Sequence, residues 1–194
     1  MPSPTRYNEV PIAIHWLTAI AIVTQFVLGW TMISLRPPSS LHFSLYQWHK
    51  SIGMTILALS VLRLIWRFLH RPPLLPAIMP AWEKRAAKLT HGSLYVLLIA
   101  LPISGWAVVS ASPLNIPTML YGFLPVPHLP VLSDLPDKRA AEQALKALHE
   151  FGGWILALLL AGHIGAALRH HFLLRDGVLV RMLPRYRPAP PSSS

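Results

Sequence analysis

The sequence has 194 residues, of which 53% are hydrophobic and only 12% are charged, against roughly 25% charged residues in an ordinary soluble domain. This composition excludes a disordered chain and a coiled coil, and the lack of cysteine excludes disulfide scaffolds, iron–sulfur clusters and thiolate chemistry. In so apolar a chain, the net charge of +10 indicates membrane topology and not nucleic-acid binding, because Lys and Arg gather on the cytoplasmic side of a membrane.

Four apolar stretches are each long enough to cross a bilayer, which takes about 20 residues. In chain order they run from about Pro11 to Ser34, Tyr46 to Leu69, Leu89 to Ala111 and Leu148 to Leu168. Residues 137–147 have a helical composition and should extend the fourth span outward, with Ser133 or Asp134 as the N-cap. We therefore predict an all-α membrane protein, with one four-helix transmembrane domain over residues 1–187 and a disordered tail over 188–194.

The connections between the spans differ in character. Residues 36–45 are expected to form a short outer loop, and the proline-rich residues 71–82 a stiff inner turn. The longest link, residues 112–136, has six prolines and several large apolar side chains, so we expect it to lie on the outer membrane interface.

The basic residues predict the orientation of the bundle. Eleven lie on the side of the two termini and five on the other, and Arg63 is left out because it lies within the second span. The eleven are Arg6, Arg67, Arg71, Lys84, Arg85, Lys88, Arg169, Arg175, Arg181, Arg185 and Arg187. The five are Arg36, Lys50, Lys138, Arg139 and Lys146. We predict a multi-pass protein of the bacterial inner membrane with both termini in the cytoplasm.

Histidines inside the spans are the main functional candidates, because ionisable side chains are costly within a membrane. His149 and His163 lie fourteen residues apart on the fourth span, which places them on one helix face about 21 Å apart. Pairing by depth brings His15 to His163 near the inner surface and His49 to His149 near the outer surface.

Two imidazoles from different helices are the axial ligands of haem iron, and the core of a helical bundle is where such a cofactor lies. A zinc site needs further ligands, and no Asp or Glu is expected within the bundle. Glycines near the histidines leave room for a planar ring, namely Gly53, Gly152, Gly153, Gly162 and Gly165. The alternative is that the histidines make structural hydrogen bonds between helices.

The sequence resembles the prokaryotic cytochrome b561 family of di-haem membrane cytochromes b. The matching segments are IAIHWLTA, WHKSIGMTILALSVLRLIWR, HGSLYVLLIALPISGW, LHEFGGW and GHIGAALRHHFLLRDGVLVRMLPR. The resemblance implies two haem b groups, held by His15, His49, His149 and His163, with ubiquinone as a substrate. It also implies that His170 lies beside the quinone and is a candidate to bind its carbonyl.

Three further residues are cofactor-binding candidates. Arg63 lies deep in the second span and needs an anion, for which the propionates of the inner haem are suitable, and Lys88 could join the same patch. His91 matches the inner haem in depth, and either a propionate, the quinone or a neighbouring helix could be its partner.

Three functions are compatible with these observations. In the first, a small periplasmic donor, with superoxide implied by the resemblance, passes electrons to membrane ubiquinone. In the second, the chain is an electron-transfer subunit that serves a docked redox protein. In the third, it is a transporter or scaffold without haem, whose histidines are structural.

Overall fold

A computed structural model describes residues 7–35, 39–70, 73 and 79–184. The predicted tail lies outside these residues, as do five of the basic residues counted for the orientation. Those five are Arg6, Arg36, Arg71, Arg185 and Arg187. The proline-rich inner turn also falls mostly outside them.

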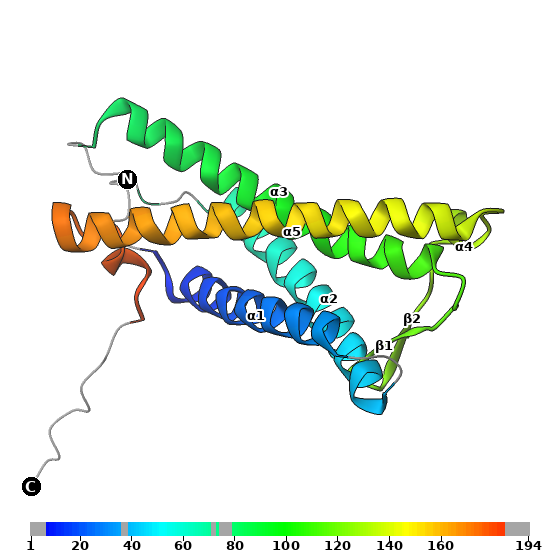
Figure 1. Cartoon of the computed structure of the whole chain (residues 1–194). Helices are drawn as coiled ribbons and strands as arrows, with labels where there is room; N and C mark the ends of the chain where they lie inside the picture. Colours follow the sequence, from blue (N-terminus) through cyan, green and yellow to red (C-terminus); the bar gives the residue numbers. More distant parts are fainter. Residues whose placement is uncertain (1–6, 36–38, 71–72, 74–78, 185–194) are drawn as a thin grey trace, which may run out of the picture.

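Four long helices form the structure, as predicted (Figure 1). They are α1 (Glu9–Ser34), α2 (Ser40–Leu69), α3 (Ala81–Ala111) and α5 (Lys138–Arg169), the last of which continues as the π-helix η1 (His170–Leu174). Each is long and apolar enough to cross a membrane. The start of α1 and the end of α5 lie at the same end of the bundle, which we call the inner end.

Three predicted boundaries are wrong at the polar ends of the helices. α2 begins at Ser40, inside the expected outer loop, because the Ser39 hydroxyl accepts a hydrogen bond from the backbone N–H of His42. α3 begins at Ala81, well before Leu89. The N-cap of α5 is Asp137, whose carboxylate accepts from the N–H of Ala140, and neither Ser133 nor Asp134.

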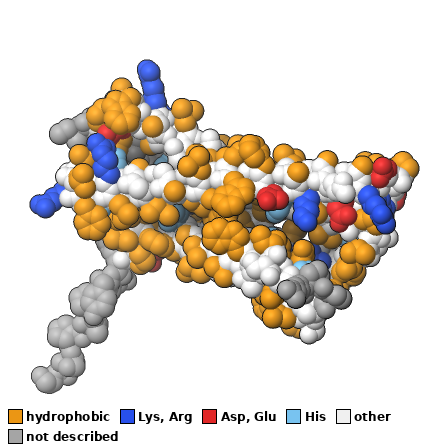
Figure 2. Space-filling model, in the orientation of Figure 1, with side chains coloured by type: hydrophobic (Ala, Val, Ile, Leu, Met, Phe, Trp, Pro, Cys, Tyr) orange, Lys and Arg blue, Asp and Glu red, His pale blue; other side chains and the backbone are white. Residues whose placement is uncertain are grey.

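The surface of the bundle is apolar. Large hydrophobic side chains such as Val23, Phe68 and Leu158 are 65%, 80% and 75% exposed. Figure 2 shows such side chains over the middle of the visible face, with charged side chains nearer its ends. A surface of this kind suits a bundle whose surroundings are lipid.

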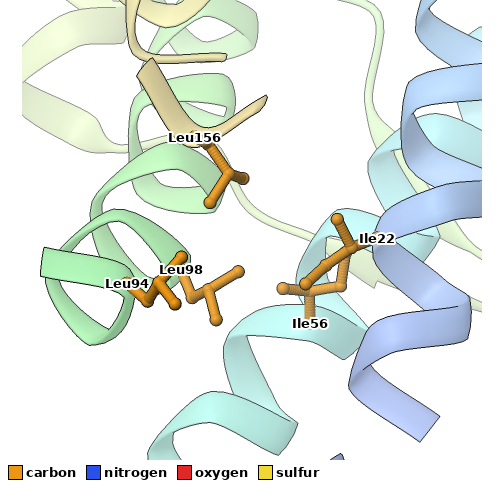
Figure 3. Close-up of a cluster of buried hydrophobic side chains, with 5 residues drawn as sticks. All are labelled: Ile22, Ile56, Leu94, Leu98 and Leu156. Atoms are coloured by element: carbon orange, nitrogen blue, oxygen red, sulfur yellow. The ribbon is translucent and has the colours of Figure 1, made fainter. Parts of the chain in front are cut away.

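The core is a small hydrophobic cluster to which all four long helices contribute (Figure 3). Its buried members are Ile22, Ile56, Leu94, Leu98 and Leu156. Leu156 lies midway along α5 between His149 and His163. The cluster therefore forms an apolar layer about 10 Å along the helix axis from each histidine level.

The long link between α3 and α5 is packed against α2. It holds β1 (Thr118–Leu120), paired antiparallel with β2 (Leu124–Val126), and the short helix α4 (Pro130–Ser133). The turn residues Tyr121 and Gly122 have positive φ values of 50° and 82°, as a tight hairpin turn requires.

Polar side chains of α2 hold this hairpin in place. Gln47 and Lys50 both donate to the carbonyl oxygen of Pro117, each at 3.1 Å. The backbone N–H of Tyr121 donates to the Ser51 hydroxyl at 3.0 Å, and its phenol pairs with the hydroxyl of Thr55. The link is thus ordered on the bundle, and its position at the outer membrane surface stays a prediction.

Candidate haem-binding site

The structure brings the four ligand candidates together in the two predicted pairs. At the outer level, His49 of α2 faces His149 of α5, with ring centres 6.3 Å apart and ring planes at 76°. At the inner level, His15 of α1 faces His163 of α5, with ring centres 6.4 Å apart and ring planes at 77°.

These separations fit a shared metal ion. Two metal–imidazole bonds of about 2 Å, with about 1 Å from each bonded nitrogen to its ring centre, separate the ring centres by about 6 Å. A direct hydrogen bond between two imidazoles gives a shorter separation, because the two nitrogens then lie about 3 Å apart. Both pairs therefore have the spacing that a bis-imidazole iron needs, and a similar angle between the rings.

Each ring of the outer pair rests against a glycine from a helix that carries no outer ligand. A Cβ atom at Gly29 of α1 would lie 3.6 Å from Cε1 of His49. A Cβ atom at Gly105 of α3 would lie 3.1 Å from Cε1 of His149. Sequence reasoning missed both glycines, because it considered only those near a histidine in the chain.

The glycines that were predicted to make room have different surroundings. A Cβ atom at Gly152 would lie 2.8 Å from Leu101, so this glycine permits close contact between α5 and α3. Gly53 faces the Gln25 side chain. Beyond the chain neighbours and the adjacent helix backbone, no described atom comes within 4 Å of a Cβ built at Gly153, Gly162 or Gly165. Room for a planar ring at these three positions stays a prediction.

Polar groups contact Nδ1 of two of the ligand candidates. Ser104 Oγ lies 2.9 Å from Nδ1 of His149. The guanidinium of Arg63, which can only donate, lies 2.9 Å from Nδ1 of His15, so the hydrogen of a neutral His15 ring lies on Nε2. Arg63 must therefore leave Nδ1 before Nε2 of His15 can bind a metal. In contrast, Nδ1 of His49 is buried and has no hydrogen-bond partner among the described residues. The inner pair thus has a positively charged group against one of its rings, whereas the corresponding contact at the outer pair is a neutral hydroxyl.

The inner level also contains the other predicted residues, in different degrees. Arg63 is half-buried and lies over the ring of Tyr95, 5.8 Å from its centre. His91 is close to His163, with ring centres 5.3 Å apart, which is shorter than the spacing of the two ligand pairs. Lys88 is exposed on α3, and no described contact joins it to the inner histidines.

His170 lies in a buried cluster of charged groups at the inner end. Its Nδ1 is hydrogen-bonded to the carboxylate of Asp176, and its Nε2 lies 3.7 Å from Oε2 of Glu83. Arg169 makes an ion pair with Glu83 Oε1 at 2.9 Å. Arg175 ends the helical region in a left-handed conformation, which turns Asp176 back toward His170.

One acidic side chain is nevertheless buried at the inner end of the bundle. Glu83 is only 8% exposed, and its Oε2 has no hydrogen bond among the described residues. It was missed because it lies in the polar first turn of α3, before the apolar stretch. A carboxylate in the first turn of a helix is a recognisable signal, since it complements the helix dipole.

Comparison with known proteins identifies a family for the chain. The family model described as prokaryotic cytochrome b561 matches residues 6–185. "Cytochrome b561 homolog 2" of Escherichia coli (strain K12) is 35% identical over 182 residues, which cover 93% of each chain. "Cytochrome b561 homolog 1" of the same organism is 30% identical over 93% of this chain and 98% of the relative.

A third relative carries the name of an activity. The "Probable superoxide oxidase CybB" of Yersinia pestis is 31% identical over 94% of this chain and 98% of its own length. The chain therefore belongs to the prokaryotic cytochrome b561 family, and is a multi-pass membrane cytochrome b of the electron-transport type.

Proposed function

We propose that the chain holds two haem b groups, one between His15 and His163 and one between His49 and His149, and transfers electrons through them. The observation that carries this proposal is the separation of the two ring pairs, 6.4 and 6.3 Å. A haem iron with two imidazole ligands takes up and releases one electron at a time.

The bundle supplies the framework for this transfer. α5 contributes one histidine to each level, so a single rigid helix fixes the distance between them. The apolar layer of Ile22, Ile56 and Leu156 lies between the two levels and keeps water from the space that separates them. Arg63, beside His15, is placed to neutralise propionates at the inner level.

We propose that the outer level faces the periplasm of a bacterial inner membrane and receives electrons from a small donor. The relative from Yersinia pestis, named as a superoxide oxidase, favours superoxide. Oxidation of superoxide to oxygen releases one electron, so two superoxide anions supply the two electrons that reduce one ubiquinone. The quinone also takes up two protons as it becomes quinol.

The inner end contains the groups that could deliver those protons. His170 has a carboxylate near each ring nitrogen, Asp176 at Nδ1 and Glu83 at Nε2. An imidazole between two carboxylates can accept a proton on one side and donate it on the other. We therefore propose that ubiquinone binds beside this cluster. His170 would bind the quinone carbonyl oxygen by a hydrogen bond, and the cluster would deliver the protons.

Addition of superoxide to the oxidised, purified protein tests the donor. We expect the absorption bands of reduced haem to appear, ubiquinol to form when ubiquinone is present, and superoxide dismutase to abolish both. Haem that dithionite reduces but superoxide does not would contradict superoxide as the donor.

A docked redox protein is the second candidate donor. The exposed tip of the β1–β2 hairpin, where Phe123 and Leu124 are 87% and 60% exposed, offers an apolar surface for such a partner. This alternative predicts that a protein which co-purifies with the chain reduces its haem when superoxide does not.

A further inference from the structure

α3 makes a specific contact with the outer ligand pair although it carries neither ligand. Its residues Ser104 and Gly105 both lie against the ring of His149. Ser104 Oγ is 2.9 Å from Nδ1 of that ring and 2.8 Å from the carbonyl oxygen of Leu101. These two contacts together determine which ring nitrogen carries the proton.

The direction of each hydrogen bond follows from the available hydrogens. A carbonyl oxygen only accepts, so the single hydroxyl hydrogen of Ser104 is donated to Leu101. The Ser104 oxygen then accepts the hydrogen of Nδ1–H of His149. Because a neutral imidazole has one N–H, its Nε2 carries a lone pair and is free to bind a metal.

Gly105 restricts the same ring sterically. A Cβ atom there would lie 3.1 Å from Cε1 of His149, closer than ordinary van der Waals contact, so the ring lies directly on the α3 backbone. The hydroxyl of one residue and the missing side chain of the next thus fix the tautomer and the orientation of His149 together.

We propose that Ser104 is a positioning residue that lowers the reduction potential of the outer haem, with Gly105 as the surface on which the ligand ring rests. This inference depends on the proposed function. A hydrogen bond from Nδ1–H to an acceptor makes Nε2 more basic and strengthens its bond to the oxidised iron. A haem bound at the outer level would then be oxidised more readily, by transfer of one electron to a haem bound at the inner level.

The test is a redox titration of the purified, haem-loaded protein, followed by visible absorption. In Ser104→Ala we expect a higher reduction potential for the outer haem. The rise should correspond to roughly a tenfold increase in the equilibrium constant for its reduction. The inner haem should not change. Ser104→Thr keeps the hydroxyl and should restore the original value. The low-spin electron paramagnetic resonance signal of the outer haem should also shift in Ser104→Ala, because it reports ring orientation.

Ser60→Ala is the matched control. The Ser60 hydroxyl is also buried, on α2, but it has no hydrogen-bond partner among the described residues. This variant should leave both potentials unchanged. Equal potentials in Ser104→Ala and the unchanged protein would overturn the inference, and so would a shift that Ser104→Thr does not restore.

Loss of the outer haem in a Ser104 variant would also test the inference. Loss in Ser104→Ala but not in Ser104→Thr supports the role of the hydroxyl, whereas loss in both variants contradicts it. The proposed function fails separately, if the unchanged protein binds no haem.

Discussion

The four proposed ligand histidines occupy positions that follow from spacing along the chain, whereas the residues around them do not. The fourteen-residue interval on α5, together with the depths of His15 and His49 in their spans, predicted both pairs, because helix geometry converts residue number into depth. Ser104, Gly105 and Glu83 could not be found in this way. Their roles depend on the rotation and height of α3 relative to α5, which its own sequence does not specify.

The separate pairing of the histidines predicts selective loss of haem. His149→Ala should leave about one haem per chain, held at the inner level, because His15 and His163 are intact. His163→Ala should leave the outer haem instead. A pyridine haemochrome assay of each purified variant, with spectra to distinguish the haems, checks this. Identical loss in both variants would contradict independent sites.

The buried carboxylate of Glu83 predicts a stability difference at the inner end. Glu83→Gln removes the ion pair with Arg169 and leaves His170 with one carboxylate. We expect a loss of about 1–3 kcal/mol in the free energy of unfolding, because groups ordered around a buried charge lose their partner. Thermal unfolding in detergent measures it. Glu150→Gln, on an exposed side chain, is the control and should unfold like the unchanged protein.

At the scale of elements, hydropathy located every long helix but not its polar ends. α2 and α3 begin before their apolar stretches, because a cap or a charged first turn stabilises a helix that protrudes from the apolar layer. The β1–β2 hairpin was not predicted at all, since its short strands lie among prolines and are held by α2 side chains.

Close packing of α3 on α5 predicts the effect of a methyl group at Gly152. Alanine normally stabilises a helix relative to glycine, but a Cβ atom here would lie 2.8 Å from Leu101. We expect Gly152→Ala to be less stable than Gly92→Ala by about 1–3 kcal/mol, because Gly92 has open space around its Cβ position. Thermal unfolding of the two variants compares them. Equal stability would show that the Leu101 side chain, whose Cδ2 atom makes this contact, moves aside at little cost.

For the whole molecule, composition and the positive-inside pattern predicted a membrane bundle and one orientation for it. The bundle is confirmed, because the four helices have the length and composition of membrane spans. The orientation, which depends on the uneven distribution of Lys and Arg, stays a prediction.

Labelling of single cysteines tests this orientation, and the natural chain has no cysteine that would interfere. Arg139→Cys, at the start of α5, should react with a membrane-impermeant maleimide in intact spheroplasts. Arg85→Cys, at the start of α3, should react only after lysis, because it should face the cytoplasm. The opposite pattern would reverse the assignment of the outer and inner levels.

The most direct test of the central claim is a reduced-minus-oxidised visible spectrum of the purified protein, combined with a count of haem per chain. We expect two haem b groups, because each ring pair, at 6.3 and 6.4 Å, has the spacing of a bis-imidazole iron site. A protein that stays colourless after expression with added haem would contradict the account and would favour a structural role for the histidines.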